Sequence, residues 1–293
     1  MHPAPSVIFF TVFSGLGFGF LAWLGIGIGI PAPQGWAAFP YFFVAFALAV
    51  GGLIASTFHL GNPRNALKAF TQWRTSWLSR EAWMAVGTLS VMGIFAAANI
   101  FLNIRIPPLG WLGGVMALVT VYTTSMMYAQ LKTVPRWNHW STSALFIFLA
   151  LGGGAILAGD TSGTLIFLTL ALVVQLYVWI AGDQRFAARG HTMETATGLG
   201  TIGKVRLYEP PHTGTNYLLN EMVHIVARKH ILKLRVIALL MGYLLPLLLA
   251  GISGHRFDLQ ITALVSHIIG ILTQRWLFFA EAEHVVGLYN NKN

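Results

Sequence analysis

The sequence contains no cysteine, and only 9% of its 293 residues are charged. Without cysteine, the chain has no disulfides, no thiol chemistry and no cysteine-ligated iron–sulfur clusters. Its charged fraction is far below the roughly 25% of ordinary soluble domains, whereas 56% of the residues are hydrophobic. These values exclude a soluble domain, a disordered tail and a coiled coil.

Acidic residues are also scarce, because 9 Asp and Glu face 18 Lys and Arg, for a formal net charge of +9. A basic chain can bind nucleic acid, but nucleic-acid binders gather their basic residues on a solvated face. Here the charges lie in gaps between apolar runs of membrane length, so we expect no nucleic-acid partner. No Asp or Glu lies in the middle of an apolar run, which disfavours a proton pump or an ion-coupled transporter.

Eight apolar segments are long enough to cross a bilayer, at about 20 residues each. These segments are 7–30, 37–58, 82–103, 110–130, 142–160, 164–182, 236–253 and 259–280. The predicted fold class is therefore an all-α integral membrane protein with eight transmembrane helices. We expect two four-helix sets, in residues 1–130 and 131–293, with a long loop at 183–235 in the second set.

The basic residues are distributed very unevenly between the two sides of the predicted membrane. The loops at 59–81, 131–141 and 183–235 hold fourteen Lys and Arg, whereas the opposite turns hold only Arg105 and Arg256. Lys and Arg are enriched in cytoplasmic loops. We therefore predict that both termini and these three loops are cytoplasmic.

Two features of the spans predict how the helices pack. In the first span, Gly15 and Gly19 are four residues apart, as are Gly25 and Gly29, and this spacing lets a neighbouring backbone approach closely. In the seventh span, Pro246 is expected to kink the helix, with the carbonyl that it frees satisfied inside the bundle.

Polar residues are densest between the second and third spans. The sequence there reads His59-Leu-Gly-Asn-Pro-Arg64 and then Trp73-Arg74-Thr-Ser-Trp77-Leu-Ser-Arg80-Glu81. His59 and Glu81 are expected at one membrane depth. An imidazole there can hydrogen-bond a quinone carbonyl, and either group can carry a proton.

The remaining residues of this candidate quinone site are its neighbours. The indoles of Trp73 and Trp77 would wall the ring, and the surrounding cations are Arg64, Arg74 and Arg80. An ordinary membrane interface, with a belt of tryptophans and a glutamate at a helix N-terminus, explains the same residues without a ligand.

Histidines and glutamates of the chain raise two metal-based alternatives. A bis-histidine haem needs two ligands at matching depth, but only His267 lies well inside a span. We therefore expect His267 to be a hydrogen-bonded core residue and expect no haem. The pairs Glu221-Met-Val-His224 and Glu281-Ala-Glu-His284 match half of a di-iron carboxylate pattern, which keeps a self-contained di-metal quinol oxidase open as an alternative, beside a transporter.

The loop at 183–235 is basic but contains Tyr, Leu and Pro rather than a low-complexity polar composition. Such a composition favours an ordered contact with a soluble partner over a free linker, and a polybasic contact with anionic membrane lipid is the alternative. The candidate docking residues are Arg136, Tyr208, His212, Tyr217 and Arg228.

With these motifs, the chain resembles the membrane-anchor subunits of DMSO reductase-type molybdopterin oxidoreductases. The resemblance rests on the eight spans and on three segments, which are His59-Leu-Gly-Asn-Pro-Arg64, Ser76-Trp-Leu-Ser-Arg80-Glu81 and Tyr128-Ala-Gln-Leu-Lys-Thr-Val-Pro-Arg-Trp-Asn138. It implies a bacterial inner-membrane protein that binds ubiquinone or menaquinone and has no haem. His59 and Glu81 match the quinone-site histidine and carboxylate of the family.

The resemblance also implies two partners, a catalytic subunit with a molybdopterin cofactor and a ferredoxin-like subunit with iron–sulfur clusters. The loop containing Pro210-Pro-His-Thr-Gly-Thr-Asn-Tyr217 and Ala227-Arg-Lys-His230 is more similar to the anchors of cytoplasmic sulfite dehydrogenases. That likeness implies electron flow from sulfite to quinone, and the alternative is flow from quinol to DMSO or another oxo-compound. Either substrate reacts in the catalytic partner.

Overall fold

The computed structural model describes most of the chain. The described residues are 2–27, 33–58, 62–209, 214, 222, 230–253 and 256–290. Within these ranges the structure contains helices and no strand, and eight helices are long and apolar enough to cross a membrane. A helix satisfies its own backbone groups, which is the requirement for an apolar span in lipid. The predicted all-helical fold with eight candidate spans is confirmed.

The first four spans agree closely with the prediction. They are α1 (Pro5–Ile26), α2 (Phe39–Thr57), α3 (Trp77–Phe101) and α4 (Pro107–Ala129). Short 3-10 helices precede two of them, η1 (Gly35–Ala38) before α2 and η2 (Pro63–Phe70) before α3. Since α3 begins at Trp77 rather than at residue 82, the residues predicted to end the loop at 59–81 form the first turn of this helix.

The last four spans include one that is divided. They are α5 (Trp140–Ala158), α6 (Thr161–Ala188), a seventh span made of α9 (Ile231–Leu239), η4 (Leu240–Leu244) and α10 (Leu245–Ile252), and α11 (Phe257–Ala280). The predicted boundaries of the loop at 183–235 were wrong at both ends, because α6 continues to Ala188 and α9 begins at Ile231. Charged side chains at both ends form ion pairs across the helices, so neither helix stops where its apolar run stops.

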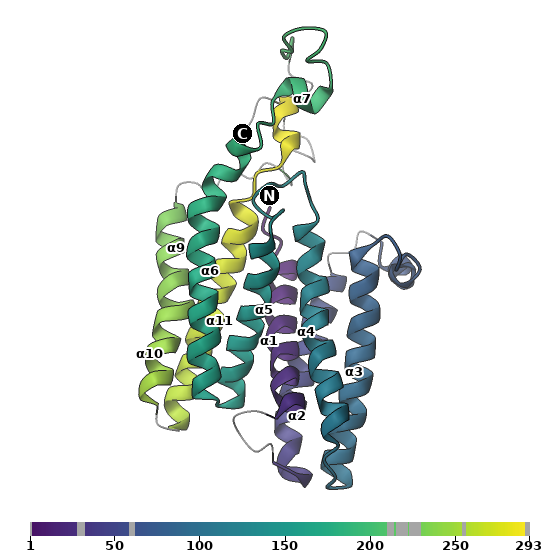
Figure 1. The fold of residues 1–293 in the computed structure, drawn as a ribbon, viewed down its shortest axis with the longest axis vertical. Coiled ribbons are helices and arrows are strands. Elements are labelled where there is room, and N and C mark those ends of the chain that lie inside the picture. Colours follow the sequence, from purple (N-terminus) through teal and green to yellow (C-terminus); the bar gives the residue numbers. More distant parts are fainter. Residues whose placement is uncertain are drawn as a thin grey trace.

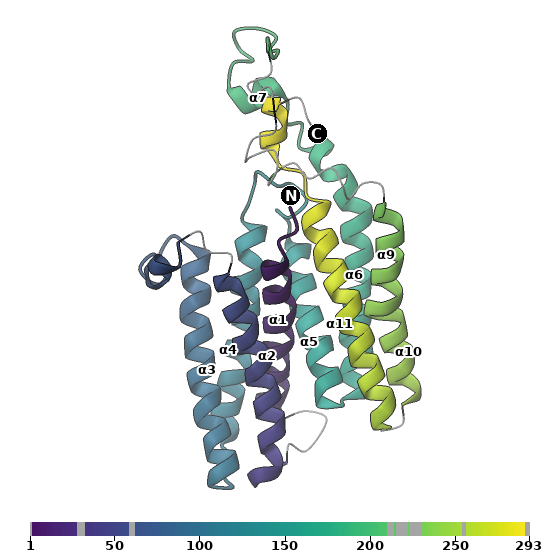
Figure 2. The same ribbon diagram turned by 180° about the vertical axis from the view of Figure 1, so that it is seen from behind.

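The helices form an elongated bundle with α3 at one edge and α9 and α10 at the other (Figure 1). The central helix, α1, packs against α2, α4 and α5, so the helices of residues 1–130 contact those of residues 131–293 directly. The start of α1 and the C-terminal 3-10 helix lie at the same end of the bundle as η2 and α7 (Met193–Thr197), as the reverse view also shows (Figure 2).

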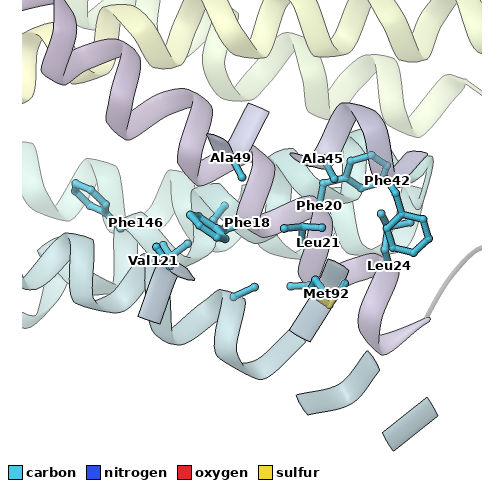
Figure 3. Packing of buried hydrophobic residues seen from close by; sticks show 14 of the residues in the cluster. Phe18, Phe20, Leu21, Leu24, Phe42, Ala45, Ala49, Met92, Val121 and Phe146 are labelled. Atoms are coloured by element: carbon cyan, nitrogen blue, oxygen red, sulfur yellow. The ribbon is translucent and has the colours of Figure 1, made fainter. Parts of the chain in front are cut away.

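Close contacts around α1 confirm the packing predicted from its glycines. A Cβ on Gly17 would collide with the backbone of Ala49 in α2, one on Gly19 with Ala150 in α5, and one on Gly25 with Gly110 in α4. The spacing of four does not mark one common contact, however, because nothing approaches Gly15, and Gly29 lies outside the described residues. The spaces between these contacts are filled by large apolar side chains, which are Phe18, Phe20, Leu21 and Leu24 (Figure 3).

The seventh span is irregular just before Pro246, where η4 is a π-helical turn. Proline has no N–H to donate to the carbonyl four residues earlier, which here belongs to Gly242. His267 of α11 hydrogen-bonds that carbonyl oxygen through Nδ1 at 2.7 Å, and Ser266 Oγ donates to the oxygen of Met241 at 2.8 Å. The predicted satisfaction of the freed carbonyl is confirmed, and so is the prediction of His267 as a hydrogen-bonded core residue.

Candidate functional site

Glu81 lies in the second turn of α3, and its side chain points into the bundle, where it is only 4% exposed. The hydroxyl of Thr124 in α4 donates a hydrogen bond to its Oε1 atom. Among the described residues this is the side-chain hydrogen bond that the carboxyl group makes. A buried carboxyl with a single hydroxyl partner is a typical group for proton transfer.

Arg80 organises the residues in front of Glu81. Its guanidinium group lies over the ring of Trp77, 4.4 Å from the centroid, and donates to the carbonyl oxygens of Trp73 at 3.0 Å and Arg74 at 2.7 Å. The turn before α3 is thereby tied to the first turn of the helix. The structure thus brings four of the predicted site residues together within one short segment next to Glu81.

The outer part of this segment faces away from the bundle. Trp73, Arg74 and Arg64 are all exposed, and Arg74 lies over the ring of Trp73 at 5.4 Å. The preceding helix η2, which contains Arg64, is attached to α3 by Trp83, whose Nε1 donates to the oxygen of Phe70 at 3.0 Å. Exposed tryptophan and arginine at a helix start suit a membrane interface.

His59 lies outside the described residues, and its pairing with Glu81 stays a prediction. The last described residues of α2, up to Phe58, lie at the same end of the bundle as the start of α3 (Figure 1).

Four charged side chains form a network of ion pairs that includes Arg136, one of the candidate docking residues. Arg136 pairs with Asp183 and, at 3.2 Å, with Glu281. Arg235 pairs with the same two carboxylates, at 2.7 Å in each case. These residues come from the loop after α4, from α6, from α9 and from the end of α11, so the network fixes three helices and one loop to each other. Arg136, predicted as a docking residue, has its side chain 11% exposed and engaged inside this network.

A second structure consists of α7 and the C-terminal 3-10 helix η5 (Val285–Asn290). The hydroxyl of Tyr289 donates to the oxygen of Ala196 at 2.5 Å, and the N–H of Val285 donates to the oxygen of Thr133 at 3.1 Å. The predicted docking residue Tyr208 is 90% exposed. The other predicted docking residues, which are His212, Tyr217 and Arg228, lie outside the described residues.

The alternative of a di-metal quinol oxidase finds no set of metal ligands in the part of the chain that the structure describes. No cluster of three or more His, Asp or Glu suited to a metal ion occurs there. Glu281, one half of a predicted Glu-x-x-His pair, is instead held by Arg136 and Arg235. The second pair, Glu221 and His224, lies outside the described residues.

Sequence reasoning missed two buried residues beside the site. Thr124 gives no signal in a sequence, because a threonine inside an apolar helix is common and its partner is 43 residues away. Arg275 does give one, since it is the single Lys or Arg within the eight predicted spans, and a charged residue in a span is a functional candidate by default. It is 2% exposed.

Comparison with known proteins decides the family. The model of the DMSO reductase anchor subunit (DmsC) family matches residues 1–182. The chain belongs to this family. This DmsC-type anchor is also 30% identical over 322 aligned residues to a subunit of the sulfite dehydrogenase of Allochromatium vinosum, with 99% of this chain and 98% of that protein covered. No solved structure matches it significantly. In the anchor, Glu81 and Thr124 lie within the matched region, whereas His267 and Arg275 lie beyond it.

Proposed function

We propose that this anchor is the quinone-binding membrane subunit of a cytoplasm-facing, molybdenum-dependent sulfite dehydrogenase. The observation behind the proposal is the buried carboxyl of Glu81, held by Thr124 near the start of α3. The relationship over nearly the full length to a subunit of a sulfite dehydrogenase favours sulfite as the substrate of the complex.

The residues around Glu81 fit a quinone head group. The ring of Trp77 is covered on one side by Arg80 at 4.4 Å and meets Tyr122 edge to face at 6.0 Å, which places two aromatic rings at the start of α3. Glu81 offers a carboxyl oxygen, and His59 is the proposed second hydrogen-bonding group. A bound quinone accepts two electrons, and its isoprenoid tail would extend into lipid.

The chemistry balances between two subunits. Oxidation of sulfite with water yields sulfate, two protons and two electrons, and reduction of a quinone to a quinol consumes two electrons and two protons. The catalytic partner would hold the molybdopterin and the ferredoxin-like partner the iron–sulfur clusters, since this chain has no cysteine to bind them. Glu81 then has one task, to hold a proton and deliver it to the quinone oxygen that it faces.

The proposed orientation has an energetic consequence. If the three basic loops are cytoplasmic, the protons released from sulfite and those taken up at Glu81 belong to the same compartment. Turnover would then move no net charge across the membrane. The absence of carboxylates from the middle of the spans agrees with this assignment.

A second direction of electron flow has support of its own. The family model that matches residues 1–182 describes a DMSO reductase anchor, and the same site would then oxidise a quinol and release protons through Glu81. The two directions differ in the catalytic partner rather than in this chain, so the substrate has to be tested in the whole complex.

The test is quinone-coupled turnover of the purified complex in lipid. Glu81→Gln keeps the size of the side chain but cannot release a proton. We expect at least a tenfold loss of sulfite–quinone activity, whereas the reduction of an artificial acceptor by sulfite in the catalytic partner should be unchanged. Glu81→Asp should retain more activity than Glu81→Gln.

The matched control is Asp258→Asn at the opposite end of the bundle, whose exposed carboxylate pairs with Arg256. It should leave quinone-coupled turnover unchanged. Full quinone activity in Glu81→Gln would overturn the site, and activity with DMSO but not with sulfite would overturn the substrate.

A further inference from the structure

Thr124, the partner of Glu81, also borders an internal cavity of about 20 Å³ that lies among α1, α4, α5 and α11. Phe18, Val121 and Phe146 form part of its apolar wall (Figure 3). Its polar lining consists of Thr11, Ser14, Thr124, His267 and Arg275. A space of this volume holds about one water molecule if it offers two to four polar partners.

Arg275 is the unusual residue of this cavity. It is 2% exposed, and its guanidinium group lies 3.6 Å from the ring centroid of Phe146 and 5.7 Å from that of Phe278. Among the described residues, it forms no salt bridge, and its Nε and Nη1 atoms have no hydrogen-bond partner. Arginine keeps its charge in proteins, and contact with aromatic rings compensates only part of the cost of burying it. The cation therefore needs hydrogen-bond acceptors inside the cavity.

His267 supplies an acceptor on another wall. Because its Nδ1 atom is used to donate to the carbonyl of Gly242, the neutral ring keeps Nε2 as an acceptor. That atom lies 3.1 Å from the point that a Cβ on Gly153 would occupy, and Leu16 Cδ2 lies 2.3 Å from the same point, so glycine here makes room for both side chains. Donor groups of Arg275 and an acceptor of His267 thus border one small volume.

Thr124 connects this volume to Glu81. Its hydroxyl has a single proton, which it can give to Glu81 Oε1 or to the oxygen of Thr120 at 3.0 Å. While it donates to Glu81, its lone pairs can accept from a water in the cavity. A water that accepts from Arg275 and donates to Thr124 would be polarised by the cation, and the positive charge would then act on Glu81 through one water and one hydroxyl. The buried phenol of Tyr128 in α4 also interacts electrostatically with both Arg275 and Glu81.

We propose that Arg275 is a positioning residue for Glu81, which acts through water in this cavity and through the Thr124 hydroxyl to favour the ionised carboxylate. The proposal rests on the proposed function for its biological role. The coupling itself is a property of the resting protein and exists whether or not a quinone binds.

The experiment measures the protonation of Glu81 directly, by infrared difference spectroscopy of its carboxyl C=O band during pH titration of the purified complex without quinone. The band is identified by its loss in Glu81→Gln. In Arg275→Met, we expect the midpoint of the titration to rise by about one pH unit, at the low end of the effect of a nearby opposite charge because water and a hydroxyl intervene. Arg275→Lys keeps the charge, so its midpoint should return most of the way to that of the original chain.

A second pair of variants tests the route. Thr124→Val removes the hydroxyl that lines the cavity and also the direct hydrogen bond to Glu81, so it should raise the midpoint by itself. If the hydroxyl carries the coupling, Arg275→Met made in the Thr124→Val background should add little further shift. Thr123→Val is the matched control, because Thr123 is equally buried on the same turn but its hydroxyl donates to the oxygen of Thr120 and does not border the cavity. An unchanged midpoint in Arg275→Met would overturn the proposal, whatever Thr124→Val does. A midpoint that depends on the halide in the buffer would also overturn it, because the cavity would then hold an anion instead of water.

The readouts separate this proposal from the proposed function. A shifted titration with unchanged quinone turnover would support the coupling and count against the quinone site at Glu81. An unshifted titration with lost turnover in Glu81→Gln would support the quinone site and count against the coupling.

Discussion

His267 of α11 hydrogen-bonds the carbonyl oxygen of Gly242 at 2.7 Å, in the π-helical turn just before Pro246. In a regular α-helix, the Gly242 oxygen would accept the N–H of the residue four positions later. That residue is Pro246, which has no N–H to donate. A side chain from one span thus completes the backbone of another. The pair explains why the single histidine in the middle of a span needs no metal ion to account for its burial.

This relationship predicts a strong coupling between His267 and Pro246. His267→Leu should destabilise the chain by about 1–3 kcal/mol, because it leaves a buried carbonyl without a donor. In a Pro246→Ala background the helix regains its own N–H, and the cost of His267→Leu should fall markedly. The measurement is a double-mutant cycle by reversible unfolding in mixed micelles. Simple additivity of the two changes would contradict the prediction.

Two adjacent glycines in α2 offer a matched test of the helix packing. A Cβ on Gly52 would collide with the backbone of Ser14 in α1, whereas nothing lies within 4 Å of one on Gly51. Gly52→Ala should therefore lower the free energy of unfolding by about 1–3 kcal/mol through overpacking. Gly51→Ala should leave the free energy of unfolding unchanged or raise it slightly, because alanine is the better helix former. Thermal unfolding of the two purified variants compares them, and equal stability would refute the close approach of α1 and α2.

The network of Arg136, Asp183, Arg235 and Glu281 should stabilise the bundle. Arg235→Met leaves Glu281, whose side chain is 3% exposed, with one cation in place of two. We expect the free energy of unfolding to fall by about 2 kcal/mol. This is less than for fully buried pairs, because the side chain of Asp183 is 46% exposed and screened by solvent. The control is Arg256→Met, which removes the exposed pair with Asp258 and should leave the unfolding temperature unchanged. Equal effects of both changes would show that the network adds nothing.

His139 should make stability depend on pH. Partial burial, followed by the positive charges of Arg185 and Arg189, lowers the pKa of His139 below its usual 6.5, and its Nδ1 accepts the N–H of Ser141 as the N-cap of α5. The unfolded chain therefore binds this proton more readily than the folded chain. Stability is complete above about pH 6.5 and decreases as the pH falls through the lower folded pKa.

The corresponding variant is His139→Asn, because asparagine caps helices without titrating. Between about pH 7 and pH 5, the unfolding temperature of the variant should fall less than that of the original chain, because the contribution of His139 is gone. At about pH 8 the two proteins should be about equally stable. An identical pH profile for both proteins would assign the decrease to other groups.

The spans could be predicted from the sequence because hydropathy alone decides which segments enter lipid. The ends were less predictable. α6 continues to Ala188 because Asp183 finds arginines from other parts of the chain, and no local pattern records such distant partners. For the candidate site, Glu81 stood out as a carboxylate at a helix start, and its burial is visible only in the structure. Thr124 could not be found, because its importance comes only from the helix that α4 packs against.

Arg275 could have been singled out from the sequence, whereas its surroundings could not. The basic residues of the loops indicate an orientation, and Arg275 is the one that remains inside a span. A charge in lipid is informative even when no acid accompanies it, since water and aromatic rings can replace the acid. The cavity beside it, however, is formed only when four helices come together in three dimensions.

The salt-bridge network has one more consequence. Since Arg136, Asp183, Arg235 and Glu281 hold α6, α9, α11 and an intervening loop together, these four side chains are held in place before anything binds to them. A partner that docks there meets a preorganised platform and does not have to immobilise these side chains at its own cost in entropy. Affinity for that face then depends on the fit of the partner rather than on the folding of the anchor.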